Sequence, residues 1–235
     1  GHLFDIRAAT DNRPYFHNFF KPGVIRLIRE FGPAQIPVTE WGYLLLLILL
    51  IPVLIISTAF ILAPLTVLKP RPEKFTLPVF GFFSLTGMGF FFIEMPLIQK
   101  MAHFLGHPVY SISAVISSLL VFSGLGGLFS SRLFTARYRI IVSILAITLI
   151  TTACAFLLDP LFQAAGSLGQ GARLAVSMAL CAPLGFFMGI PFPAALDRIK
   201  KQEPQCVPWA WGVNGFASVV SILLAALLAV IFGFR

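Results

Sequence analysis

Six long apolar stretches, separated by short segments that hold most of the charge, constrain this sequence more than any other feature. They cover residues 41–68, 76–99, 109–131, 140–158, 174–196 and 209–234. A helix needs about 20 mostly apolar residues to cross roughly 30 Å of hydrocarbon. Only 11% of the residues are charged and 58% are hydrophobic, whereas about 25% are charged in soluble domains. We therefore predict an all-α, polytopic transmembrane helix bundle of about six spans. The composition excludes a soluble enzyme, a disordered tail and a disulfide-rich secreted module.

Residues 1–40 differ from the rest and form a polar-aromatic leader. Within it, residues 22–31 alternate apolar and charged side chains at helical spacing, as in an amphipathic helix that lies in the headgroup plane. A soluble helix packed on another domain explains the pattern equally well. The predicted organisation is thus a short interfacial segment over 1–40 and a six-helix transmembrane domain over 41–235. Because the chain begins without Met, we expect a processed chain or part of a longer polypeptide.

Basic residues are concentrated in alternate loops. The loops after the first, third and fifth stretches contain Lys69, Arg71, Lys74, Arg132, Arg137, Arg139, Arg198, Lys200 and Lys201. The loops after the second and fourth stretches contain only Lys100 and Arg173. The positive-inside rule then predicts that the first set of loops is cytoplasmic. The net charge of +8 is expected to contact lipid headgroups, and no nucleic-acid partner is predicted.

Motifs for metal, cofactor or catalytic chemistry are absent from the sequence. Cys154, Cys181 and Cys206 form no close-spaced metal pair, and their expected state is a buried inert thiol. His103 and His107 are four residues apart and would share a face of a continuous helix, but metal or haem would need further ligands. There is no glycine-rich phosphate loop and no Ser-His-Asp pattern. We predict no metal, no cofactor and no catalysis by this chain alone.

Small residues four apart predict where the helices pack closely. The pairs are Gly185 with Gly189, Ser123 with Gly127, and Ala225 with Ala229. Helices in lipid gain little from burying apolar surface against each other, so close backbone approach at small residues drives their association. The pairs indicate a tight bundle.

Glu94 is the most informative single residue because it is the only charge in the second stretch. A carboxylate in an apolar span costs about 2.5–3.5 kcal/mol on insertion scales, so it should face a cavity or a partner. Two interpretations stay open: a structural carboxylate bonded to a neighbouring element, or a group that handles a proton or a substrate. Gln99, His103 and His107 follow it as interfacial polar residues expected to cap this span and to hydrogen-bond near Glu94.

A second polar cluster is predicted at the opposite end of the bundle. Pro191 and Pro193 lack amide donors and should break the fifth helix, which would free backbone carbonyls. Discontinuous helices of this kind line solute sites in many transporters. Asn214 is the only side-chain amide in the last two stretches and would line the same region. The alternative is that the prolines simply end a helix. Trp41, Trp209 and Trp211 are expected to anchor at the membrane interface.

Several blocks of sequence resemble bacterial membrane-bound spermidine synthase-like proteins. Residues 10–16 (TDNRPYF) are similar to the family's T-D-D-R-P-Y/F-F segment, which joins its soluble and membrane parts. Residues 89–100 (GFFFIEMPLIQK) resemble G-F-M-x-x-E-I-P-L-I-Q-R. FLGHP at 104–108, FSGLG at 122–126, PFP at 191–193 and PWAWGVNG at 208–215 follow in order. The resemblance covers residues 10 to about 220.

The resemblance implies a bacterial inner-membrane protein whose other members carry a soluble nucleotide-type domain beside transporter-like helices. That domain and its motifs are missing here, so aminopropyl transfer is not carried over to any residue, and Asn12 departs from the family's second Asp. The implied partners are the lipid bilayer and a soluble spermidine synthase-like domain or subunit. Six spans are half of a typical twelve-helix transporter, which favours either an anchor without transport of its own or a homo-oligomer such as a dimer.

Three functions follow from these observations. The first is a transporter-like domain that handles a small polar or cationic solute through Glu94. The second is an integral-membrane anchor or accessory subunit that docks a soluble enzyme or a larger complex without transport of its own. The third is a membrane-embedded enzyme with its site around Glu94 and His107.

Overall fold

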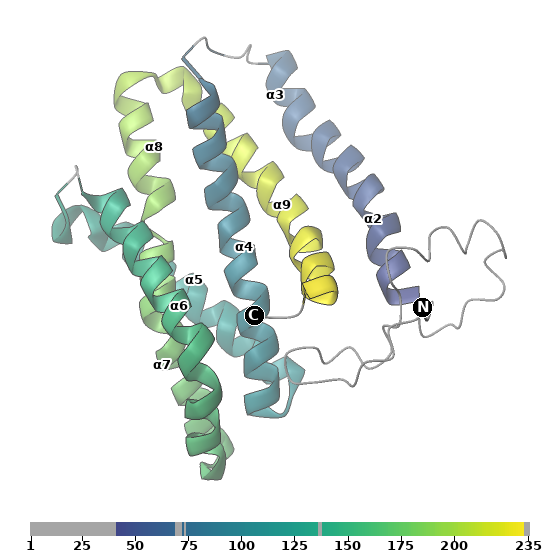
Figure 1. The fold of residues 1–235 in the computed structure, drawn as a ribbon. Helices are drawn as coiled ribbons and strands as arrows, with labels where there is room; N and C mark the ends of the chain where they lie inside the picture. Colours follow the sequence, from purple (N-terminus) through teal and green to yellow (C-terminus); the bar gives the residue numbers. More distant parts are fainter. Residues whose placement is uncertain (1–40, 69–71, 73, 136–137, 233–235) are drawn as a thin grey trace, which may run out of the picture.

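The computed structural model of the chain describes residues 41–68, 72, 74–135 and 138–232 (Figure 1). Within these residues the regular secondary structure is all helical, and six helical segments are long and apolar enough to cross a membrane. The predicted all-α transmembrane bundle of six spans is therefore confirmed. The leader over residues 1–40, including its expected amphipathic helix, lies outside the described residues.

The helices follow one another with short connections. The first span is α2 (Trp41–Ser57), a π-helical turn η3 (Thr58–Leu62) and α3 (Ala63–Leu68). The second, third and fourth spans are α4 (Leu77–Leu105), α5 (Pro108–Leu133) and α6 (Arg139–Ala164), the last followed by the short η4 (Ala165–Ser167). The fifth is α7 (Gln170–Met188) with α8 (Pro191–Gln202), and η5 (Pro204–Cys206) leads into the sixth, α9 (Val207–Phe232).

The arrangement is centred on α4, which packs along α9 on one side and against α5 on the other (Figure 1). Helix α5 packs in turn on α7. The remaining spans are peripheral, because α2 and α3 contact α9 whereas α6 contacts α7 and α8. Both peripheral spans expose long apolar rows, for example Ile51 and Phe60 in the first span and Leu149 and Phe156 in α6. Such rows are suited to face lipid.

Close backbone contact joins α5 to α7. A Cβ atom added to Gly126 would lie 1.8 Å from the carbonyl oxygen of Phe186, and one added to Gly189 would lie 2.0 Å from that of Ser123. A Cβ on Gly185 would lie 3.2 Å from the Cα of Leu119. The predicted pairs Ser123/Gly127 and Gly185/Gly189 therefore pack against each other. Of the third pair, Ala225 is buried, and the side chain of Ala229 is not among those described.

Helix α4 is longer than expected. The apolar stretch 76–99 accounts for only part of it, because the helix passes through Pro96 and ends at Leu105. A proline removes one amide donor but does not by itself end a helix whose neighbours hold it in place. The true end is made by Gly106, which adopts the left-handed conformation with φ 73°. That conformation is common directly after a helix and suits glycine.

Prolines shape two other spans. The fifth span is divided, since α7 ends at Met188 and α8 begins at Pro191. In the first span the π-helical turn directly precedes Ala63 and Pro64, and the amide of Ala63 donates to the carbonyl of Thr58, five residues back. A π-turn of this kind accommodates an irregularity without ending the helix.

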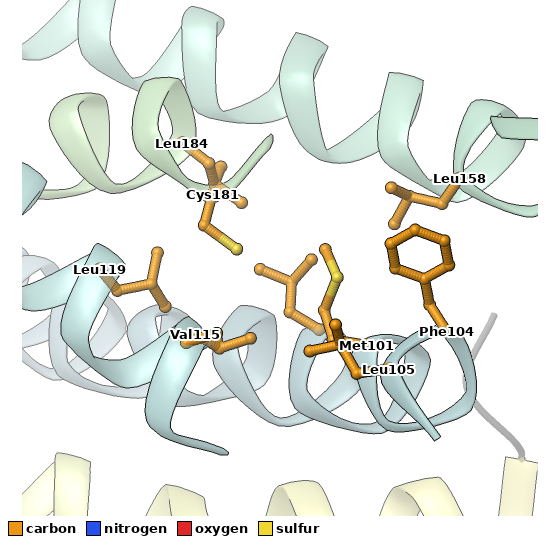
Figure 2. Close-up of a cluster of buried hydrophobic side chains, with 10 residues drawn as sticks. Met101, Phe104, Leu105, Val115, Leu119, Leu158, Cys181 and Leu184 are labelled. Atoms are coloured by element: carbon orange, nitrogen blue, oxygen red, sulfur yellow. The ribbon is translucent and has the colours of Figure 1, made fainter. Parts of the chain in front are cut away.

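Two clusters of buried side chains fill the bundle. The larger one joins α4, α5, α6 and α7 through residues that include Met101, Val115, Leu119, Leu158 and Leu184, and Figure 2 shows these side chains converging. The second lies at the other end of α4 and joins the segment before it to α8 and α9 through Phe75, Phe83, Ala195, Cys206, Trp209, Ala210 and Val213. Helix α4 thus contributes to both clusters.

The glycine contact between α5 and α7 can be tested by adding one methyl group. The variant Gly126→Ala is expected to lower the free energy of unfolding by about 1–3 kcal/mol, because overpacking forces the two backbones apart. Thermal unfolding in detergent measures the change. The matched control is Gly124→Ala on the same helix, since a Cβ there has nothing within 4 Å. Equal melting temperatures for the two variants would contradict the predicted contact.

Candidate functional site

Glu94 lies on the buried face of α4, at the junction of the two apolar clusters. Its side chain is 6% exposed. Gly87, Glu94 and Met101 follow one another at seven-residue intervals, which keeps them on one face of the helix. Phe83, before Glu94, belongs to the second cluster, whereas Leu97, one turn after it, belongs to the larger one. Glu94 is therefore a buried residue at mid-helix, between the parts of α4 that belong to the two apolar clusters.

No described residue forms a hydrogen bond or an ion pair with the Glu94 carboxylate. Polar groups buried in a protein are normally hydrogen-bonded, and each exception calls for an explanation. A buried charge is costlier still unless it is paired. Within the described residues, the structure provides no neighbour that would make Glu94 a purely structural carboxylate.

Asn214 ties α9 to α4. Its Nδ2 donates to the carbonyl of Phe83 at 3.0 Å and lies 3.3 Å from the Oγ1 of Thr86. Gly87 allows this approach, because a Cβ there would lie 2.5 Å from the carbonyl oxygen of Asn214. Interhelical bonds of this kind contribute about 0.6 kcal/mol on average and up to about 1.7. The amide predicted to line a solute site is thus engaged in helix packing.

Gln99, His103 and His107 lie toward the end of α4 and beyond it, and none of them bonds to Glu94 among the described residues. Gln99 is partly buried, and both histidines are exposed. At about 1.5 Å per residue, His103 is roughly 13 Å from Glu94 along the helix axis. The two histidines share no helix face, because the left-handed Gly106 separates α4 from α5, and the ring of His107 packs edge-on against Tyr110.

An ion pair at this end of the bundle was not predicted from the sequence. Lys100 Nζ lies 2.8 Å from the Oδ1 of Asp159, which joins α4 to α6. The side chain of Lys100 is only 16% exposed. Asp159 stands at the end of an apolar stretch and directly before Pro160, a position typical of a loop. The sequence feature that could have revealed this ion pair is the presence of one acid and one base at the same end of the bundle, each at the end of an apolar stretch.

Arg173 closes the same end. In the first turn of α7, it donates to the carbonyls of Leu168, Phe104 and Gly166. Its guanidinium also lies 5.9 Å from the centre of the Phe104 ring, which is stacked on Phe162. These bonds satisfy carbonyls that the end of α4 and the loop before α7 leave free. Arg173 is therefore a capping residue.

At the opposite end, the predicted prolines and tryptophans have different surroundings. Pro191 is buried at the start of α8, and Pro193 is partly buried, 3.6 Å from where a Cβ of Gly127 would stand. Trp209 is buried beside Phe75. Trp211 is 57% exposed, with Phe192 against its ring, which suits an interfacial anchor. Trp41 begins α2, and its side chain is not among those described.

Two further ion pairs hold α8 at that end. The Nη1 atom of Arg139, at the start of α6, lies 3.6 Å from the Oδ2 atom of Asp197 in α8. The Nε atom of Arg139 is buried and has no hydrogen-bond partner among the described residues. Lys74, before α4, pairs with Glu203, directly after α8. Hydrogen bonding to Lys74 lowers the pKa of the Glu203 carboxyl, and the same bond raises the pKa of Lys74.

The described residues bring together no group of three or more His, Cys, Asp or Glu side chains that could hold a metal ion. All three cysteines are free thiols. The chain matches no protein-family model, no curated protein and no solved structure.

The bond from Asn214 to α4 predicts a stability effect. The variant Asn214→Ala is expected to lower the free energy of unfolding by about 1 kcal/mol, because it removes an interhelical hydrogen bond in the apolar region. Unfolding in detergent, followed by circular dichroism, measures the change. The control is Gln163→Ala, an exposed amide on α6. An effect no larger than that of the control would show that the bond contributes nothing to stability.

The Lys74–Glu203 pair predicts a pH dependence. Because folding lowers the pKa of Glu203, its stabilising effect is present above the ordinary carboxylate range and is lost as the pH falls through the lowered value. The raised pKa of Lys74 has the opposite sense, so its effect is lost only in strong alkali. In unfolding curves measured at low salt, Glu203→Gln should abolish the part of the loss of stability at acid pH that comes from protonation of Glu203. High salt should weaken it in the wild type, because both groups are near the surface. The prediction would be contradicted if the free energy of unfolding fell equally with decreasing pH in the wild type and in Glu203→Gln.

Proposed function

We propose that this chain is a membrane carrier domain for a small cationic solute, with Glu94 as the group that neutralises the solute's charge. The observation that carries the proposal is a carboxylate that is 6% exposed and has no hydrogen-bond or ion-pair partner among the described residues. Ionisable residues inside transmembrane segments are rare, and they typically mark ion or substrate pathways.

The surroundings of Glu94 support a cationic solute. Helix α9, which packs along α4, has no charged side chain over Val207–Phe232, so nothing on it competes for the carboxylate. The resemblance of residues 89–100 to spermidine synthase-like membrane proteins agrees with a small organic cation. Asn214 holds α4 against α9 in this proposal, and Gln99 and His107 mark the entrance at the end of α4.

The proposed orientation follows from the loop charges. Lys74, Arg139, Lys200 and Lys201 lie at one end of the bundle, whereas Lys100 and Arg173 lie at the other. Lys100 is in addition neutralised by Asp159. The positive-inside rule favours the first end as cytoplasmic, in the inner membrane of a bacterium.

The test is uptake of a labelled polyamine into vesicles that contain the full chain. Glu94→Gln should reduce uptake at least tenfold, since a buried ion pair that loses one partner loses more than about 1.4 kcal/mol. Glu203→Gln is the matched control, because it removes a carboxylate outside the spans. Unchanged, pH-dependent uptake with Glu94→Gln would remove Glu94 from the mechanism. No uptake by the wild type would refute the carrier.

A second function is supported by the peripheral helices. The apolar rows of α2, α3 and α6 are largely exposed within a single chain, so these spans offer surface to another membrane protein as well as to lipid. An anchor or accessory subunit of a larger membrane complex would use such surface, whereas a soluble enzyme would bind outside the bilayer. Purification in mild detergent separates the two functions: a stoichiometric partner and absent uptake favour the anchor, whereas a solitary active protein favours the carrier.

A further inference from the structure

The acidic residues of the bundle differ in whether a base neutralises them. The described residues include four acids, and three of these form ion pairs: Lys100–Asp159, Arg139–Asp197 and Lys74–Glu203. The fourth is Glu94, which is 6% exposed and forms no ion pair with a described residue. When Glu94 is ionised, its site therefore holds one negative charge that no base on the described helices balances.

The helices packed on α4 add no second free carboxylate. Helices α9, α5 and α7 have the most extensive contact with α4, and none of them contains Asp or Glu. Glu94 is the only acid in α4. Asp197, on α8, is engaged with Arg139. A cation bound at Glu94 would thus meet a single anionic group among the described residues.

The Glu94 carboxylate is buried but not sealed. In the described residues, three buried side-chain atoms without a hydrogen-bond partner are fully enclosed: Ser118 Oγ, Arg139 Nε and Thr151 Oγ1. The carboxylate oxygens of Glu94 also lack a partner, yet they are not in this group. They therefore keep some access to the surroundings, which the enclosed Ser118 hydroxyl does not have.

The surface of α4 around the carboxylate is apolar. Phe90 and Leu97 lie one turn before and one turn after Glu94, where the residues of a helix are neighbours. Both pack in the larger cluster. Helix α4 also continues through Glu94 without a break, whereas transporters bind Na⁺ with the carbonyls of unwound helices. These features favour a cation with an apolar body over a small inorganic ion.

A divalent metal ion does not match the site either. Ca²⁺ takes about six to eight oxygen ligands, and Mg²⁺ demands octahedral geometry. The described residues bring together no group of three or more His, Cys, Asp or Glu side chains that could hold a metal ion. A lone carboxylate matches instead the single charge of one ammonium group.

We propose that the Glu94 site takes an alkylammonium ion through one ammonium group, and that further positive charges on the solute add nothing to its affinity. A second ammonium group held near the first would be a charge without a partner in the apolar region, which is unfavourable. If a second anion were present, engaging it would raise the affinity by a factor of about 10²–10⁴. A polyamine therefore binds through one of its ammonium groups only. The inference rests on the proposed function, because it names the class of solute that the same carboxylate neutralises.

The test is isothermal titration calorimetry of the full chain in detergent with butylamine and 1,4-diaminobutane. The two amines have the same carbon chain but carry one and two ammonium groups at neutral pH. We expect the diamine to bind no more than about twofold tighter, which is the statistical gain from two equal groups. Glu94→Gln should weaken both at least about tenfold, because a buried charge pair loses one partner. Glu203→Gln, outside the spans, is the matched control and should weaken neither.

Three results overturn the inference: a diamine that binds the wild type more than about twofold tighter than butylamine, no binding of either amine, or binding that Glu94→Gln weakens less than about tenfold. The comparison of the two amines uses the wild type alone, and circular dichroism excludes misfolding of Glu94→Gln. The proposed function fails separately. Amine binding with the expected preference and no polyamine uptake would refute the carrier and leave the single-charge site standing, whereas polyamine uptake with a preferred diamine would refute only the single-charge site.

Discussion

Backbone-to-backbone contact at glycine is the interaction on which this bundle depends. In hydrocarbon, apolar side chains gain little by leaving lipid for a neighbouring helix, so shape and close approach must hold the spans together. Gly126 and Gly189 bring α5 and α7 within contact of each other's carbonyl oxygens, and Gly87 does the same for α4 and α9. These contacts hold α5 to α7 and hold α4, which carries Glu94, to α9; the peripheral spans pack on their outer sides.

The polar groups of the protein are distributed by depth. Ion pairs lie at the ends, where Lys100 meets Asp159 on one side and Arg139 meets Asp197 on the other. Hydrogen-bonded polar groups such as Asn214 lie farther in and join helices. Glu94 and Ser118, at mid-helix, are the buried polar groups that this scheme leaves without partners among the described residues of α4 and α5. That contrast separates the polar groups that join helices from those that do not.

Much of the fold could be predicted from the sequence, because the length of each apolar stretch is set by the membrane and small residues mark the close contacts. Glu94 could be singled out for the same reason, since one charge in an apolar span is visible without a structure. The end of α4 could not, because it depends on Gly106 and on capping by Arg173, which is distant in sequence. Ser118 could not be distinguished either, since serines are frequent in α5 and only packing reveals which hydroxyl has no acceptor. The leader, the soluble partner and the orientation stay predictions.

The break between α7 and α8 has a mechanical consequence. Gly189, at the joint, is pressed against the backbone of Ser123, so the joint is pinned to α5 even though the helix is interrupted there. Beyond it, α8 packs through Ala195 into the cluster that contains Phe83 and Val213, and Asp197 and Glu203 add ion pairs to Arg139 and Lys74. The chain therefore passes from α7 to α8 at a point that is fixed by backbone contact, and α8 is in turn packed on α6 and α9. The interruption thus lets the chain change direction after Met188 without loosening the contact between α5 and α7.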